Sequence, residues 1–127
     1  YDGIFIDTLD NAEAMETADP RAARGMVAAG AALITAVRAR FPRIRIMLNR
    51  GYAATPLVAP YIDLLLGEAM ASRWSFAERR YERTSASDWE WQAERLRAAR
   101  ALNPALTLTT LDYWDPADRA GVSALYA

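Results

Sequence analysis

The stretch that decides the fold is YDGIFIDTLD, residues 1–10. Its apolar residues Ile4, Phe5 and Ile6 lead directly into Asp7. A short apolar run of this kind is typical of a strand in a parallel sheet that is buried on both faces. The carboxyl ends of such strands carry the functional residues of α/β folds, so Asp7 is the first candidate for a catalytic residue.

Three more apolar segments share this pattern and predict strands with polar carboxyl ends. The carboxyl ends of parallel strands meet at one edge of the sheet, so residues that are far apart in the sequence are brought together there. The segments and the polar residues that follow them are 44–48 with Asn49 and Arg50, 62–66 with Glu68, and 106–111 with Asp112 and Tyr113.

Helix signals separate these strands. Asp19 followed by Pro20 predicts the start of a helix that ends near Phe41. The capping-box pattern of Ser87 and Glu90 predicts a second long helix. Other signals predict a short helical turn at residues 55–56, a loop over residues 70–85 and a last helix that starts at residues 115–116.

The alternation of these segments predicts an α/β fold in which helices cover a parallel β-sheet. The 127 residues suffice for a single domain and hold four β-α units. A (β/α)8 TIM barrel has eight such units in about 250 residues. The chain is therefore either half of such a barrel or a small open sheet. No G-x-G-x-x-G follows a predicted strand, which argues against a dinucleotide site.

The composition bears on which partners to expect. A net charge of -1 gives no electrostatic reason to expect binding to nucleic acid or to an anionic membrane surface. No apolar run approaches the ~20 residues that span a bilayer. The sequence starts almost inside the first predicted strand and without a Met, so we expect it to be a piece of a longer protein.

The absence of some residue types limits which side chains of this chain can act as a base or a nucleophile. The chain has no Cys and no His, and its fifteen basic residues are all Arg. Asp, Glu, Tyr and hydroxyl groups remain for proton transfer and nucleophilic attack. Two carboxylates at one edge of a sheet, Asp7 and Glu68, suit the cleavage of a glycosidic bond. One attacks the anomeric carbon or activates water, and the other protonates the leaving oxygen, without a cofactor.

The alternation of side chains along each strand indicates which residues point away from the helices. Asp7 and Asn49 lie on the less aliphatic faces of their strands, so they are expected to point into the barrel interior. The more aliphatic faces are expected to contact the helices. This alternation does not decide whether Asp112 or Tyr113 points into the barrel interior.

Three further residues near this edge are candidates for substrate binding. Arg50 either binds an anion or pairs with a carboxylate of the rim. Asp10 either belongs to the rim or caps the turn before the first helix. The ring of Trp114 can stack on a sugar.

Four segments together resemble a known family: DGIFIDTLD (2–10), LNRG (48–51), DLLLGE (63–68) and TLTTLDYWD (107–115). They are similar to the endo-α-1,4-polygalactosaminidase family, glycoside hydrolase family 114, and to related domains that hydrolyse galactosamine-containing exopolysaccharides of biofilms. The resemblance covers nearly the whole chain. It implies that residues 1–127 are a single domain from the C-terminal half of a (β/α)8 barrel, roughly its fourth to seventh strands, and that the protein is extracellular or periplasmic.

The resemblance also implies roles for individual residues. The family's catalytic Asp and Glu match Asp7 and Glu68, with Asp7 as the nucleophile and Glu68 as the acid/base of a retaining hydrolysis. Asn49, Asp112 and Tyr113 match positions that line the family's cleft. The implied substrate is a galactosamine-containing polysaccharide. Its cationic sugars would be attracted by an acidic rim. The residues expected in that rim are Asp7, Asp10, Glu68, Asp112 and Asp115.

Three alternatives stay open. The barrel could bind carbohydrate without cleaving it. A metal-dependent enzyme could hold Mg²⁺ between Asp7, Glu68 and Asp112, because strand-end carboxylates suit a hard cation. Half of a barrel also leaves two sheet edges open, which predicts self-association or a covering by the missing half of the barrel.

Overall fold

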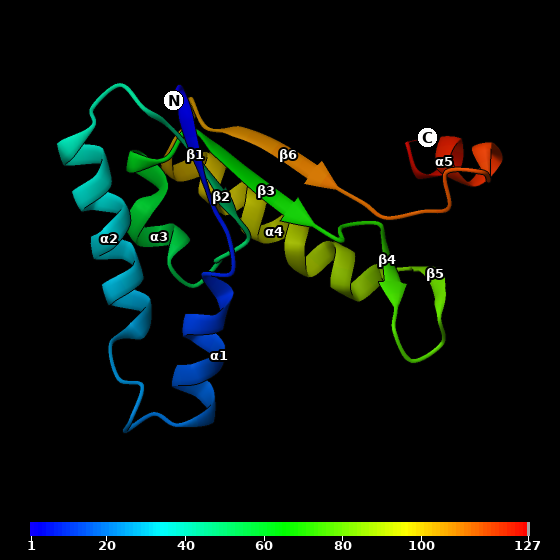
Figure 1. The fold of residues 1–127 in the computed structure, drawn as a ribbon, viewed down its shortest axis with the longest axis horizontal. Helices are drawn as coiled ribbons and strands as arrows, with labels where there is room; N and C mark the ends of the chain where they lie inside the picture. The colour runs from blue at the N-terminus through cyan, green and yellow to red at the C-terminus, as the bar shows by residue number, and fades with distance from the viewer. Residues whose placement is uncertain (127) are drawn as a thin grey trace.

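The chain forms one parallel sheet with helices packed on it, as a computed structural model that describes residues 1–126 shows (Figure 1). The strands of the sheet are β1 (Gly3–Ile6), β2 (Arg45–Asn49), β3 (Leu64–Glu68) and β6 (Thr107–Leu111), and a separate antiparallel hairpin is formed by β4 (Ser72–Ser75) and β5 (Arg80–Arg83). The helices are α1 (Asp10–Ala18), α2 (Met26–Arg40), α3 (Thr55–Val58), the 3₁₀ turn η1 (Ala59–Tyr61), α4 (Ala86–Leu102) and α5 (Arg119–Leu125). No helix within this described part is long and apolar enough to cross a membrane.

The order of the strands decides between the two expected architectures. The sheet has the order β1-β2-β3-β6, so each strand pairs in parallel with its neighbour along the chain once the hairpin is set aside. A doubly wound open sheet reverses its strand order and carries helices on both faces. A barrel keeps its strands in chain order with all helices outside. The predicted α/β class is confirmed, and the four units have the arrangement of a segment of a barrel wall.

The core lies between the sheet and the helices. Ile46, Leu48 and Leu65 are fully buried and form one cluster with Ile34 of α2 and Leu96 of α4. These strand residues belong to the aliphatic faces, so the prediction that those faces contact the helices is confirmed. Burial of each such side chain stabilises the fold by about 1.5 to 3 kcal/mol.

The segment after β1 differs from the prediction. The carboxylate of Asp19 accepts hydrogen bonds from the backbone amides of Arg21 and Ala22, at 3.1 and 2.9 Å, so the capping signal is real. The turn does not continue as a helix, because Gly25 adopts a φ of 85° and α2 begins at the next residue. The predicted helix start at Asp19 is therefore wrong, and helix α1 was not predicted.

Two other helix starts and one loop were also predicted wrongly. Helix α4 is capped by Ser85 rather than by Ser87, since the Ser85 hydroxyl accepts from the amide of Asp88 at 3.0 Å. Helix α5 begins after Asp118, whose carboxylate accepts from the amide of Gly121 at 2.9 Å. The predicted loop over residues 70–85 contains the hairpin of β4 and β5.

An ion pair joins the sheet to α2 at the end opposite the predicted site. Arg38 donates to Asp63 at 2.6 Å and to the backbone oxygen of Ile44 at 2.7 Å. The amide of Ile46 donates to the same Asp63 oxygen at 2.8 Å. Burial alone would raise the pKa of Asp63. The bond from Ile46 and the bond and charge of Arg38 outweigh it and hold the pKa below its ordinary value.

Replacing Asp63 tests this ion pair. Asp63→Asn is expected to lower the free energy of unfolding at neutral pH by about 1 to 3 kcal/mol, because Arg38 loses its charged partner. The folded-state pKa of Asp63 lies below the ordinary 3.8. The stabilisation by the charged pair is therefore fully present above that pH and is lost as the pH falls through the folded-state value. Urea unfolding across this acid range measures both effects.

Glu90→Gln is the matched control, because Glu90 forms an exposed ion pair with Arg97 at 2.7 Å. It is expected to change the free energy of unfolding by less than about 1 kcal/mol. An acid-unfolding curve of Asp63→Asn that parallels the wild-type curve would contradict the role of Asp63.

Candidate active site

The side-chain amide of Asn49 joins the two predicted catalytic carboxylates. Its nitrogen donates to Asp7 Oδ1 at 2.8 Å and to Glu68 Oε2 at 2.6 Å. Asn49 is only 5% exposed, so its orientation is fixed by its surroundings. Flipping the amide would place its oxygen against two carboxylates, so only this orientation satisfies both partners.

The sheet explains why these three residues meet. Asn49 ends β2, which lies between β1 and β3. Asp7 directly follows β1, and Glu68 is the last residue of β3. The parallel pairing aligns Ile6 with Leu48, which brings the ends of β1 and β2 to the same level.

The chain turns sharply after each of these three residues. Thr8, Arg50 and Ala69 have φ angles of 59°, 52° and 54°. The left-handed conformation costs a residue with a side chain about 1 to 2 kcal/mol. Such strain is concentrated at functional sites, where the surrounding structure maintains it.

Tyr113 is the fourth member of the cluster. Its hydroxyl donates to Glu68 Oε1. Leu111 of β6 lies opposite Glu68 of β3, so alternation places Tyr113 on the face of Glu68 and Asp112 on the other. The hydrogen bond to Glu68, with partial burial and the negative charges of Glu68 and Asp7, raises the pKa of Tyr113 to about 12. The pairing register of β3 and β6 thus shows that Tyr113, and not Asp112, points toward Glu68, which the alternation of side chains within one strand could not decide.

Asp112 holds the base of the hairpin. Its Oδ1 accepts hydrogen bonds from the backbone amides of Ala71 and Ser72, at 2.6 and 2.9 Å. This bonding does not fit the alternative in which Mg²⁺ is held between Asp7, Glu68 and Asp112. Within residues 1–126 no group of three such side chains is arranged to hold a metal ion.

The other candidates of the rim are engaged elsewhere. Asp10 is the first residue of α1 rather than a cap, and its carboxylate pairs with Arg50 at 3.6 Å. The indole of Trp114 donates to Asp118 at 2.9 Å. Asp115 accepts a hydrogen bond from a backbone amide. The expected acidic rim is therefore reduced to Asp7 and Glu68, which lack a cationic partner among the described ion pairs.

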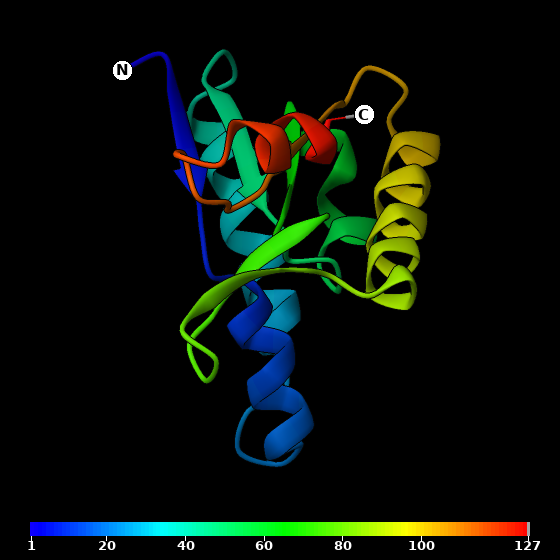
Figure 2. The ribbon, with the colours of Figure 1, turned by 90° about the vertical axis from the view of Figure 1, so that its right-hand side faces the viewer.

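Two hollows open beside Glu68. The hairpin of β4 and β5 lies in front of the carboxyl ends of the strands in the view of Figure 2. One has a volume of about 270 Å³ and the other about 470 Å³. Both are lined by Arg50, Glu68 and Arg73. The larger is also lined by Trp74 and Phe76 of the hairpin. The sequence did not single out Arg73 or Phe76, because a loop was predicted there.

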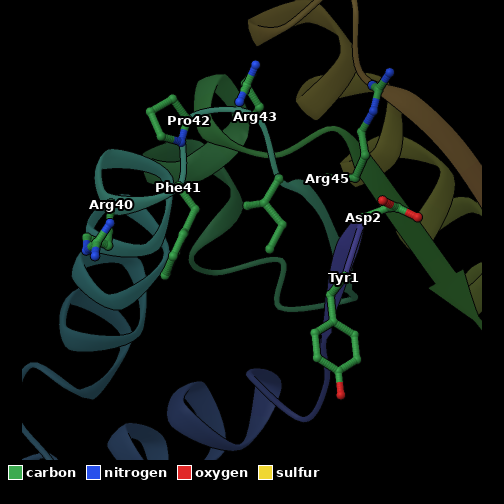
Figure 3. A pocket seen from close by; sticks show the side chains of 8 residues that line it. Tyr1, Asp2, Arg40, Phe41, Pro42, Arg43 and Arg45 are labelled. Carbon is green, nitrogen blue, oxygen red and sulfur yellow. The ribbon is translucent and has the colours of Figure 1, made fainter.

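A larger hollow of about 650 Å³ lies at the opposite end of the sheet, beside the first residues of β2. Arg40, Arg43 and Arg45 line it, together with Tyr1 and Asp2. Figure 3 shows that the three arginine side chains point away from one another. They do not converge on a common point, so this hollow lacks the geometry of a site.

Comparison with known proteins supports the expected resemblance. No family model and no curated protein sequence matches the chain. Among solved structures, the chain is similar to the glycoside hydrolase domain of PelA from Pseudomonas aeruginosa, with a TM-score of 0.82 and 26% sequence identity. A variant of that domain in which a glutamate is replaced by alanine gives the same values. The likeness covers 98% of this chain and 47% of the PelA domain.

This chain has the fold of half a glycoside hydrolase domain. The four sequence motifs indicated a resemblance to glycoside hydrolases, and the likeness to this solved domain confirms it. The chain spans about half the length of the solved structures that it matches.

The contact between Tyr113 and Glu68 can be tested by titration. Glu68→Gln is expected to move the pKa of Tyr113 from about 12 toward the ordinary value of 10, because it removes the carboxylate that raises it. NMR of chains with ¹³C-labelled tyrosine rings follows each phenol separately. Tyr52 is an internal control: its pKa is also raised to about 12, but by burial, and should not move. A Tyr113 midpoint that Glu68→Gln leaves unchanged would contradict the contact.

The positive φ of Ala69, the residue after Glu68, leads to a second prediction. Ala69→Gly is expected to raise the free energy of unfolding by about 0.5 to 1 kcal/mol, because glycine adopts a positive φ without steric cost. Thermal unfolding measures the change. Ala98→Gly in the exposed face of α4 is the control and should be destabilising by about 1 kcal/mol. Equal destabilisation by both changes would exclude strain at Ala69.

Proposed function

We propose that the protein is a glycoside hydrolase that cleaves α-1,4-linked galactosamine-containing polysaccharide with Asp7 and Glu68. The observation that carries this proposal is the shared hydrogen bonding of both carboxylates to Asn49. The likeness to a glycoside hydrolase domain supports the reaction type. The sugar is proposed on the resemblance of the four sequence motifs.

The separation of the carboxylates supports a retaining reaction. The two oxygens that share the Asn49 amide are each one hydrogen bond from the same nitrogen, at 2.8 and 2.6 Å. Retaining glycosidases hold their carboxyl groups about 5 to 5.5 Å apart, whereas inverting enzymes leave about 6.5 to 9.5 Å for a water molecule. A pair joined by a single NH₂ group fits the shorter distance better.

Asp7 is proposed as the nucleophile. Its Oδ1 accepts from Asn49 and from the backbone amide of Thr8, at 2.8 and 2.7 Å. Oδ2 is left to attack the anomeric carbon. The bond from that carbon to the leaving oxygen breaks, and its electron pair stays on the oxygen. A glycosyl ester of Asp7 results, which water then hydrolyses.

Glu68 is proposed as the acid and base of the two steps. It gives its proton to the leaving oxygen in the first step and takes a proton from the attacking water in the second. The Tyr113 hydroxyl suits both states, because it donates to the ionised carboxylate and accepts from the protonated one. Asn49 keeps the other oxygen of Glu68 in place throughout.

Replacement of the two carboxylates tests the proposal. Asp7→Asn and Glu68→Gln are each expected to lower the rate of hydrolysis of a partly de-N-acetylated galactosamine polymer by about a thousandfold. Released reducing ends measure the rate, and NMR of the first product gives the anomeric configuration, which should be retained. Glu90→Gln, on an exposed helix face, is the matched control and should hydrolyse at the wild-type rate.

Hydrolysis that survives both replacements would refute the assignment of the catalytic pair. Binding of the polymer without hydrolysis by the wild-type chain would instead support a carbohydrate-binding barrel that does not cleave its ligand. An inverted product would keep the two carboxylates but change the role of Asp7 from nucleophile to base.

A further inference from the structure

A buried glutamine of α4 connects the turns that follow β2 and β3. Helix α4 packs against β3 and β6 (Figure 1), and its Gln92 is only 7% exposed. Gln92 Oε1 accepts a hydrogen bond from the hydroxyl of Tyr52 at 2.8 Å, and its Nε2 donates to the backbone oxygen of Ala69 at 3.2 Å. Tyr52 lies in the turn after Asn49, and Ala69 directly follows Glu68. Gln92 therefore reaches the backbone beside the candidate site from the helix side of the sheet.

The orientation of the Gln92 amide is fixed by its partners. A backbone oxygen only accepts hydrogen bonds, so the nitrogen of Gln92, and not its oxygen, faces Ala69. The oxygen of Gln92 then faces Tyr52, whose hydroxyl donates to it. Gln92 also lines the smaller hollow beside Glu68, but each of its polar atoms already has a protein partner.

The bond from Gln92 holds a strained residue. Ala69 has a φ of 54°, a conformation that is unfavourable for alanine and persists only where the surrounding structure maintains it. The amide of Ala69 donates to the backbone oxygen of Leu111 in β6 at 2.7 Å, and its own oxygen accepts from Gln92. The two bonds hold the peptide groups on both sides of the Ala69 Cα. They thereby fix the direction in which the chain leaves Glu68.

Tyr52 contacts the chain on the other side of Glu68. A Cβ atom on Gly67 would lie 3.4 Å from the Tyr52 hydroxyl, so this hydroxyl packs close to the Gly67 backbone. Tyr52 is itself buried, and its ring packs edge-on against Trp91 with the ring centroids 5.5 Å apart. The residue before Glu68 is thus packed against Tyr52, and the residue after it is bonded to Gln92.

We propose that Gln92 is a positioning residue for Glu68. Through its bonds to Tyr52 and Ala69 it fixes the backbone on both sides of Glu68, so that the carboxylate stays at its distance from Asp7. The inference rests on the proposed function for the reaction, whereas the positioning itself can be measured without turnover. Removal of Gln92 lets the turn relax and displaces the carboxylate, and a displacement of about 1 Å in an active site can lower the rate by about a hundredfold.

The phenol of Tyr113 reports the position of the Glu68 carboxylate. Its hydrogen bond to Glu68 is the largest cause of its raised pKa of about 12. Gln92→Leu removes both hydrogen bonds of Gln92 with a side chain of similar size. It is expected to move the pKa of Tyr113 toward the ordinary value of 10, as measured by NMR of ¹³C-labelled tyrosine rings. In the hydrolysis assay, Gln92→Leu should lower kcat by about tenfold or more and change KM by less than about twofold.

Asn103→Leu is the matched control on the same helix. The side-chain amide of Asn103 ends α4 and donates to the backbone oxygen of Ala59 at 2.8 Å, near the amino ends of the strands. Its removal should lower the stability of the chain and leave the Tyr113 pKa unchanged. A Tyr113 pKa that moves equally in Asn103→Leu and Gln92→Leu would overturn the positioning role.

A second variant keeps the test decisive if Gln92→Leu does not fold. Tyr52→Phe combined with Gln92→Leu removes the buried hydroxyl together with its partner, so this hydroxyl is not left unpaired. The Tyr113 pKa should fall in the same direction. A Tyr113 pKa that stays near 12 in the folded variant would overturn the positioning role, as would a kcat equal to that of the wild type. A shifted pKa without hydrolysis by the wild-type chain would refute the proposed enzyme and keep the positioning role, whereas hydrolysis with an unshifted pKa would do the reverse.

Discussion

The amide group of Asn49 is the contact on which the site depends. One nitrogen donates to Asp7 and to Glu68, so two carboxyl groups are held close together by a single neutral group. This is achieved only where three neighbouring parallel strands end at the same level with the donor on the middle strand. The consecutive strand order, the register and the sharp turns after the strands are therefore all conditions for one pair of hydrogen bonds.

The two ends of the sheet serve opposite purposes. At the amino ends of the strands, Asp63 is fully engaged by Arg38 and by the amide of Ile46, an arrangement that stabilises the fold. At the carboxyl ends, Asp7 and Glu68 lack a cationic partner within the described chain, and strained residues follow them. The stabilising ion pair and the candidate site thus lie at opposite ends of the sheet, as stabilising and functional residues do in barrel enzymes.

The sequence predicted the parts of the site that depend on alternation within one strand. Asp7, Asn49 and Glu68 could be found because each ends an apolar run and parallel strands bring such ends together. Tyr113 and Asp112 could not be separated, since their directions depend on Leu111 lying opposite Glu68 in another strand. The hairpin escaped prediction for a similar reason, because Trp74 and Tyr81 stabilise it across strands. Helix α1 gave little signal, because Ala12 is its only buried residue within the described chain.

The two ends of the hairpin segment are hydrogen-bonded to each other. The Thr84 amide donates to the Ala71 oxygen at 3.0 Å, its hydroxyl donates to the Met70 oxygen at 2.7 Å, and Asp112 binds the amides of Ala71 and Ser72. The first end of the hairpin segment is thereby fixed to Asp112, which follows β6, and the two ends are fixed to each other. The hydrogen bonds that anchor the hairpin thus come from residues at its base and from Asp112, not from its tip. The tip of the hairpin is in effect a replaceable cassette, and exchanging its sequence on the same base is expected to change the lining of the hollow beside Glu68.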